Sequence, residues 1–293
     1  MSTAAAADPR LIAAPSAPGS PDVPAGRAAT MRAFLGVMRL EWRRQLLTPR
    51  VLWPLLLAGL PVAVTGVMAW AATHFHAKLG DIPNLSETYA NLYHALVVRI
   101  VLFFGCLALF LNLVRGEVEE RTMHYLLLTP VRRPLIVAGK YLAAVGSGWL
   151  LFGTTTILSW VLIHLPKGLD TAFIGGAWRQ LGAYVAMTML GCMGYGGAFL
   201  LLGSLLRSPG PMVALFFVWE WFQFLLPPLL KQVSVVHYLK ALTPVPISEG
   251  PFALLADPTP VPLAVLQVLI YAALTVSLAA WVASRADLDY GKG

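Results

Sequence analysis

The sequence has 293 residues, of which 58% are hydrophobic and only 12% are charged. A water-soluble domain carries about twice that share of charged residues, so the composition excludes a single soluble globule and indicates a membrane protein. In a soluble protein, the formal net charge of +7 would suggest binding to nucleic acid. The positions of the basic residues give this charge another meaning, and no nucleic-acid partner is predicted.

The first 30 residues are rich in Ala, Pro, Ser and Gly, and they lack the unbroken apolar stretch of a secretory signal. We predict a disordered cytoplasmic tail over 1–30. Residues 31–50 then predict an amphipathic helix. Arg32, Arg39 and Arg43 share one face of it, and the other face holds Phe34, Leu35, Met38, Trp42 and Leu46. Next to a membrane span this pattern favours a helix in the cytoplasmic interface, although a soluble amphipathic helix has the same pattern.

Six apolar segments are long enough to cross a bilayer as helices, namely 51–73, 95–114, 135–165, 179–206, 212–230 and 262–283. Helices are expected because every backbone amide in hydrocarbon needs a partner within the protein. The prediction is an all-α integral membrane domain over 51–285, followed by a cytoplasmic tail over 286–293. The proline-broken apolar stretch before the sixth span predicts short re-entrant helices on the outer side.

Lysine and arginine residues set the expected orientation of these spans. Seven precede the first span and five lie in the connection between the second and third spans. With Arg207, Arg285 and Lys292 that side has 15, whereas the other side has six, including Arg99 near the outer end of its span. Because positive charges stay inside, we expect both termini to be cytoplasmic and the chain to lie in the inner membrane of a bacterium.

The connection between the second and third spans is unusually charged for this chain. It reads RGEVEERTMHYLLLTPVRRPLIVAGKYL from Arg115 to Leu142. The Thr129-Pro130 pair should end a short helix, because proline disfavours helical geometry in the residue before it. Such a helix–stop–helix segment is either a solvated loop or a docking site for a cytoplasmic partner, and composition does not decide between the two.

This stretch resembles the signature of the type-2 ABC exporter permeases. The resemblance rests on acidic residues followed by a threonine, a Leu-Leu pair, a Thr-Pro, a basic residue and the Gly139-Lys140 that opens the next span. Arg121 stands where that family usually has glycine, and His124 stands where an acid is common. The resemblance implies that a coupling helix between spans 2 and 3 docks on a cytoplasmic ATPase, through Glu117, Glu119, Glu120, Arg121, Thr122, His124 and Tyr125.

The chain itself has no G-x-x-x-x-G-K-[ST] phosphate-binding loop, since Pro134 stands where the first glycine would be. We therefore expect no ATPase activity and no cofactor bound by this chain, with ATP and Mg bound by a partner subunit. The resemblance also implies a second copy of the membrane subunit or a homologous permease, with membrane lipid around both.

Glu220 is the one acid deep inside a predicted span, between Trp219 and Trp221. An ionisable group at that depth serves a pathway or a pair. The three residues are therefore candidates for the substrate pathway, and a protonated carboxyl hydrogen-bonded to another helix for packing is the alternative. His74 and His76 could suggest a metal, but a two-residue spacing puts their rings on different faces of a helix, and no metal site is predicted.

The fourth span is punctuated by glycines, at Gly182, Gly191, Gly194, Gly196, Gly197 and Gly203. Close helix approach explains them, and a hinge is the alternative. The sequence thus predicts the permease subunit of an ABC exporter. A proton-coupled transporter that uses Glu220 and a non-transporting membrane scaffold or assembly factor remain open, and the transported substrate is not indicated.

Overall fold

The computed structural model describes residues 27–47, 51–74, 85–111, 113, 133–206, 208–225, 227–245 and 259–285. Within these ranges every regular element is a helix, which confirms the all-α class. Most of the predicted tail over 1–30, the tail over 286–293 and the whole coupling segment lie outside the described residues.

Five helices in the described part are long and apolar enough to cross a membrane. The first is α2 (Leu52–His74), and the second combines α3 (Leu85–Leu92), the π-helical η4 (Tyr93–Leu102) and α4 (Phe103–Phe110). The others are α7 (Arg133–His164), α9 (Ala177–Leu205) and α13 (Val261–Arg285). Four of the six predicted spans therefore correspond closely to observed helices, and the second and fifth differ.

The second span begins at Leu85, ten residues before its predicted start. The first part of this span contains polar residues, so its hydropathy alone does not predict a membrane span. Several of these polar residues are buried in the structure. Tyr89 donates a hydrogen bond to the carbonyl oxygen of Thr156, and Tyr93 donates one to that of Tyr184. The expected position of Arg99 near the end of its span was therefore wrong, because Arg99 lies near the middle of the stretch from Leu85 to Phe110.

The predicted fifth span over 212–230 is not one continuous helix. The chain forms α10 (Gly210–Trp221), a 3₁₀ turn η6 (Gln223–Leu225) and the short α11 (Pro228–Lys231). Twelve helical residues extend about 18 Å, which is less than the roughly 30 Å of a hydrocarbon core. The broken segment continues into α12 (Val235–Ala241), so short helices precede the last span as expected.

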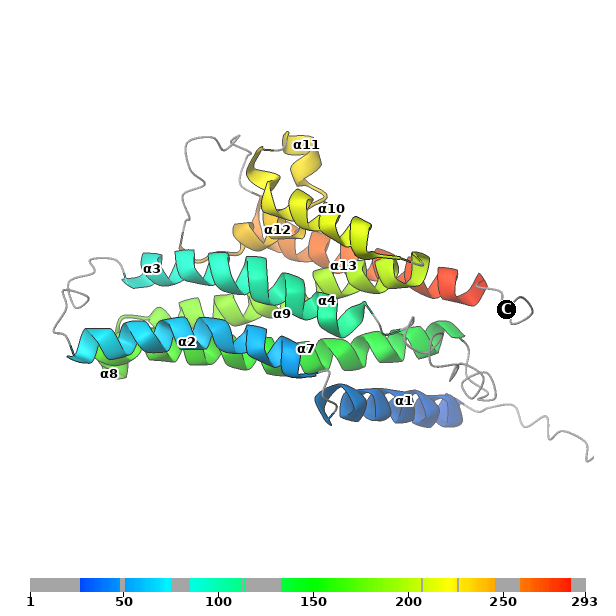
Figure 1. The fold of residues 1–293 in the computed structure, drawn as a ribbon, viewed down its shortest axis with the longest axis horizontal. Helices are drawn as coiled ribbons and strands as arrows, with labels where there is room; N and C mark the ends of the chain where they lie inside the picture. Colours follow the sequence, from blue (N-terminus) through cyan, green and yellow to red (C-terminus); the bar gives the residue numbers. More distant parts are fainter. Residues whose placement is uncertain are drawn as a thin grey trace, which may run out of the picture.

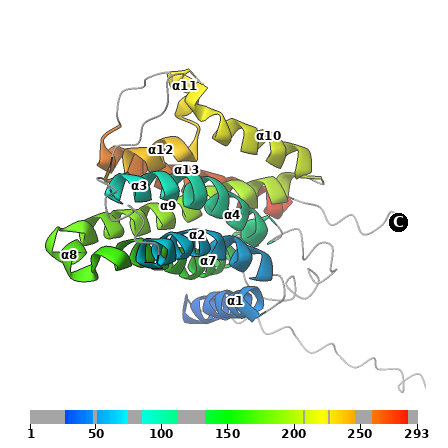
Figure 2. The ribbon, with the colours of Figure 1, turned by 60° about the vertical axis from the view of Figure 1, so that its left-hand side comes forward.

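The long helices run side by side along the longest axis of the molecule (Figure 1). The central α9 packs against both α13 and α7, and α7 also packs against α2. In both views α1 (Arg27–Leu47) lies outside α7, and α10, α11 and α12 lie on the opposite face of the bundle (Figure 2). The single helix α1 and the short helices α10, α11 and α12 thus flank the bundle from opposite sides.

The distribution of apolar side chains is that of a protein in lipid. Large apolar residues are exposed along the outer helices, for example Leu56 at 69% and Leu274 at 64%. Polar contacts lie between helices instead: the hydroxyl of Thr188 forms hydrogen bonds with those of Tyr93 and Thr156. This is the arrangement expected where the surrounding solvent is hydrocarbon and hydrogen bonds between helices replace water.

The glycines of α9 allow neighbouring helices to approach closely. A Cβ atom on Gly203 would overlap the backbone carbonyl of Leu111, and one on Gly197 would overlap the side chain of Thr275. Gly191, Gly194 and Gly196 also face side chains of other elements, whereas nothing lies within 4 Å of a Cβ on Gly182. The packing role predicted for these glycines is confirmed at five of the six positions.

Candidate functional site

The predicted ATPase-coupling residues from Glu117 to Tyr125 lie outside the described residues. The structure does describe both ends of that segment. Leu113 ends the preceding part, and Arg133 begins α7. Leu113 and α7 contact each other through the side chain of Lys140.

Lys140, near the start of α7, is buried at 2% exposed. Its Nζ atom lies 3.7 Å from Oε2 of Glu41 in α1 and donates a hydrogen bond of 3.3 Å to the carbonyl oxygen of Leu113. Glu41 is also buried. One cation thus joins α1, α7 and the backbone at Leu113, which follows the second span.

The same face of α1 approaches α7 through apolar side chains. A Cβ on Gly139 would meet the ring of Phe34 at 3.2 Å, so the absence of a side chain there lets the two helices pack. Leu35 and Trp42 of α1 stay exposed, at 47% and 41%. The helix therefore presents one face to α7, while Leu35 and Trp42 remain open to the surroundings.

We expect Lys140→Met to release α1 from the bundle, because the buried Glu41 would lose its counter-charge. Breaking a buried ion pair costs about 3–5 kcal/mol, and the 3.7 Å separation places this pair at the lower end. Limited proteolysis within α1 and thermal unfolding measure the effect. The control is Lys167→Met, at an exposed lysine in the 3₁₀ turn η5 (Leu165–Lys167) that follows the far end of α7. Equal stability of the two variants would contradict the assignment, and the double variant with Glu41→Gln should recover part of the loss.

Glu220, in α10, is 3% exposed and receives four hydrogen bonds. Its Oε2 accepts from the hydroxyls of Tyr195 at 3.1 Å and Ser234 at 2.9 Å, and from the amide of Val236 at 3.2 Å. Its Oε1 accepts from the amide of Val235 at 3.0 Å. The two amides can only donate, so the arrangement suits a carboxylate.

The two amides belong to the first residues of α12, whose N-cap is Ser234. The first amides of a helix have no partner within it, and the helix dipole favours negative charge there. Glu220 thus caps α12 from another element and ties α10, α12 and α9 together. This geometry supports the packing alternative for Glu220.

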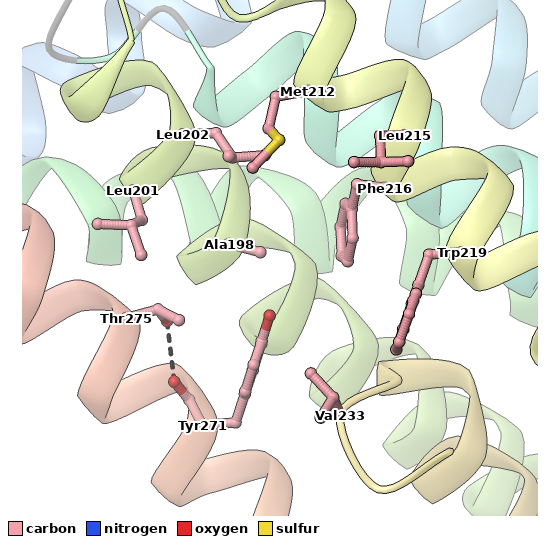
Figure 3. Close-up of a pocket in the computed structure, with 10 residues that line it drawn as sticks. All are labelled: Ala198, Leu201, Leu202, Met212, Leu215, Phe216, Trp219, Val233, Tyr271 and Thr275. Atoms are coloured by element: carbon pink, nitrogen blue, oxygen red, sulfur yellow. Dashed lines mark hydrogen bonds between the residues drawn. The ribbon is translucent and has the colours of Figure 1, made fainter. Parts of the chain in front are cut away.

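The two neighbouring tryptophans lie in different surroundings. The ring of Trp221 lies 5.3 Å from the guanidinium of Arg99 and 5.3 Å from the ring of Phe217. Trp219 instead lines a cavity of about 280 Å³ between α9, α10, α13 and Val233 (Figure 3). Of the three pathway candidates, Trp219 is the one in that cavity's lining.

Sequence reasoning missed the other contributors to these sites. Tyr271 and Thr275 line the same cavity from α13, but in sequence they are two polar residues in a long apolar helix. Glu41 gave a signal that could have been used, because it is the one acid of a helix otherwise rich in arginine. Its partner Lys140 is 99 residues away, and only the fold shows the pairing.

The sequence model of one family, described as ABC-2 family transporter protein, matches residues 63–288. No curated protein matches the chain significantly. The family match begins within α2, continues past the end of α13 and covers well over half of the chain. Because this range includes the five apolar helices in whole or in part, the protein is a multi-pass membrane permease, and the chain belongs to the ABC-2 transporter family.

Proposed function

We propose that this chain is the membrane-spanning permease subunit of an ABC exporter and that it forms the substrate path while a separate cytoplasmic ATPase supplies the energy. The family match over 63–288 is the observation that carries the proposal. Membrane subunits of this family generally work with such an ATPase. The chain brings no phosphate-binding loop of its own, so ATP and Mg bind to the partner.

The proposed arrangement has six spans, with the short helices from α10 to α12 completing the fifth crossing and the outer re-entrant segment. Both termini lie in the cytoplasm of a bacterial cell, because 15 of the 21 lysines and arginines fall on that side. Two permease copies pair, and the segment from Glu117 to Tyr125 docks on the ATPase. Lys140 then links the start of α7 to α1 and to the backbone at Leu113, which precedes the docking segment.

The proton-coupled alternative requires Glu220 to gain and lose a proton during transport. Each protonation would disturb a carboxylate that accepts four hydrogen bonds and would loosen the cap of α12. The observed contacts therefore favour a fixed role for Glu220. Transport by vesicles that contain this chain alone, without a nucleotide-hydrolysing partner, would overturn the ATP-driven proposal.

The coupling segment gives a direct test. We expect the triple substitution Glu117→Gln, Glu119→Gln and Glu120→Gln to weaken binding of the ATPase about tenfold or more, because hydrogen bonds to charged groups at an interface are lost. Co-purification and ATP hydrolysis by the assembled complex measure this effect. The matched control is Glu87→Gln, at an exposed acid in α3, which should leave both unchanged. Equal behaviour of the two variants would remove the segment from the docking site.

A further inference from the structure

The cavity lined by Trp219 has walls from three helices. Ala198 comes from α9, Phe216 from α10 and Tyr271 from α13, and Val233 closes one side (Figure 3). Its volume is about 280 Å³. An apolar cavity of about 150 Å³ is enough to hold benzene, and sites for drug-sized ligands begin at about 300 Å³. The space therefore suits one ring system or a short alkyl segment.

The lining of this cavity carries no lysine, arginine, aspartate or glutamate. The hydroxyl of Thr275 is already used, since it donates to the carbonyl oxygens of Tyr271 and Ala272 at 2.9 and 3.0 Å. The hydroxyl of Tyr271 instead points into the cavity (Figure 3), and the hydrogen bonds of the described residues give it no partner. A ligand oxygen that accepts a hydrogen bond from this hydroxyl would satisfy a polar atom in an otherwise apolar cavity.

The rim of the cavity is apolar and open. Met212, Leu215 and Val233 are 47%, 61% and 56% exposed, and Leu274 on the adjoining helix α13 is exposed as well. In a membrane permease, exposed apolar residues at membrane depth face hydrocarbon wherever no second copy of the chain covers them. A molecule dissolved in the bilayer can therefore reach the cavity sideways, without crossing a polar surface.

We propose that this cavity binds an uncharged amphiphile from the bilayer, with an apolar body against α9 and α10 and one uncharged oxygen on the hydroxyl of Tyr271. A charged ligand is disfavoured because the lining offers no counter-charge, and desolvating an unpaired charge is costly. The site goes beyond the proposed transport function. It needs neither nucleotide nor the ATPase, so its test is independent of that function.

Photolabelling of the purified protein in lipid nanodiscs tests this site. The probes are a long-chain alcohol with a diazirine on its alkyl chain and the matching carboxylic acid and alkane. We expect the alcohol to label peptides containing Ala198 and Tyr271 more strongly than either of the other two. Equal labelling by the acid, or no labelling of these peptides, would overturn the proposal.

Substitutions around the cavity sharpen this test. Val233→Trp fills the cavity from its rim, where an exposed side chain can be enlarged with little effect on folding. Ala198→Phe fills the cavity from the opposite wall. Both substitutions should remove most of the label. Leu274→Trp adds the same ring as Val233→Trp outside the cavity and should change nothing. Tyr271→Phe should lower labelling by the alcohol about threefold to tenfold, toward that of the alkane, because one hydrogen bond is lost.

Two further results would contradict the assignment. Full labelling in both Val233→Trp and Ala198→Phe would show that the probe binds elsewhere. Cross-links from Met212 or Leu215 to a second copy of the chain, in place of label, would show that another protein fills the cavity.

Discussion

Replacing Glu220 with glutamine should destabilise the protein and release the N-terminus of α12. A glutamine side chain has one acceptor oxygen, and its amide group would face donors. At least one of the amides of Val235 and Val236, now bonded at 3.0 and 3.2 Å, would lose its acceptor. Each buried donor left unpaired costs about 1–3 kcal/mol, so we expect a loss of about 2–4 kcal/mol in the free energy of unfolding.

Two measurements test this prediction, one of global stability and one of the local stability of α12. Thermal unfolding in detergent reports the loss of global stability, and hydrogen exchange at Val235 and Val236 reports the local opening of α12. Ser234→Ala is the graded control, because it removes one donor to Glu220 and the N-cap of α12. An N-cap substitution of this kind costs about 1 kcal/mol, so Ser234→Ala should fall between Glu220→Gln and the native protein.

The opposite result would restore the other interpretation of Glu220. If Glu220→Gln kept its stability and the protection of α12 but lost transport, the carboxylate would act on a substrate or a proton. Unchanged transport together with unchanged stability would remove Glu220 from both roles.

Alanine at Gly203 should weaken the protein, whereas alanine at Gly182 in the same helix should strengthen it. The new Cβ at Gly203 would overlap the backbone carbonyl of Leu111, which cannot move away as a side chain can. Moving α9 away from Leu111 to relieve this overlap lowers the stability by about 1–3 kcal/mol. At Gly182 no atom lies within 4 Å, and the helix gains about 0.5–1 kcal/mol from the loss of a flexible residue.

The opposite signs of the two expected stability changes separate a packing role of these glycines from a hinge role. Thermal unfolding of the two variants, measured side by side, should shift in opposite directions. A hinge role for the glycines would instead predict that both variants keep their stability and lose transport. Because Leu111 lies two residues before Leu113, which accepts a hydrogen bond from Lys140, Gly203→Ala should also increase proteolysis of α1.

The sequence by itself determined the helical class, the membrane setting and the membership of the family. These depend on long apolar runs and on a local signature, and both are properties of consecutive residues. The close-approach role of the glycines in α9 was also predictable, because small residues repeated in an apolar helix leave room for a neighbour. Hydropathy failed where buried polar residues form bonds between helices, so the second span was predicted ten residues too short at its start.

Only the tertiary structure decided the partners of the charged residues and the existence of the cavity. Glu220 binds amides 15 and 16 residues further along the chain, and Lys140 pairs with Glu41 across 99 residues. Neither spacing belongs to a helical repeat, so no local pattern predicts it. The cavity likewise needs α9, α10 and α13 to pack around Tyr271. Local preference sets which segments become helices, but the choice among possible contacts depends on how their faces fit together.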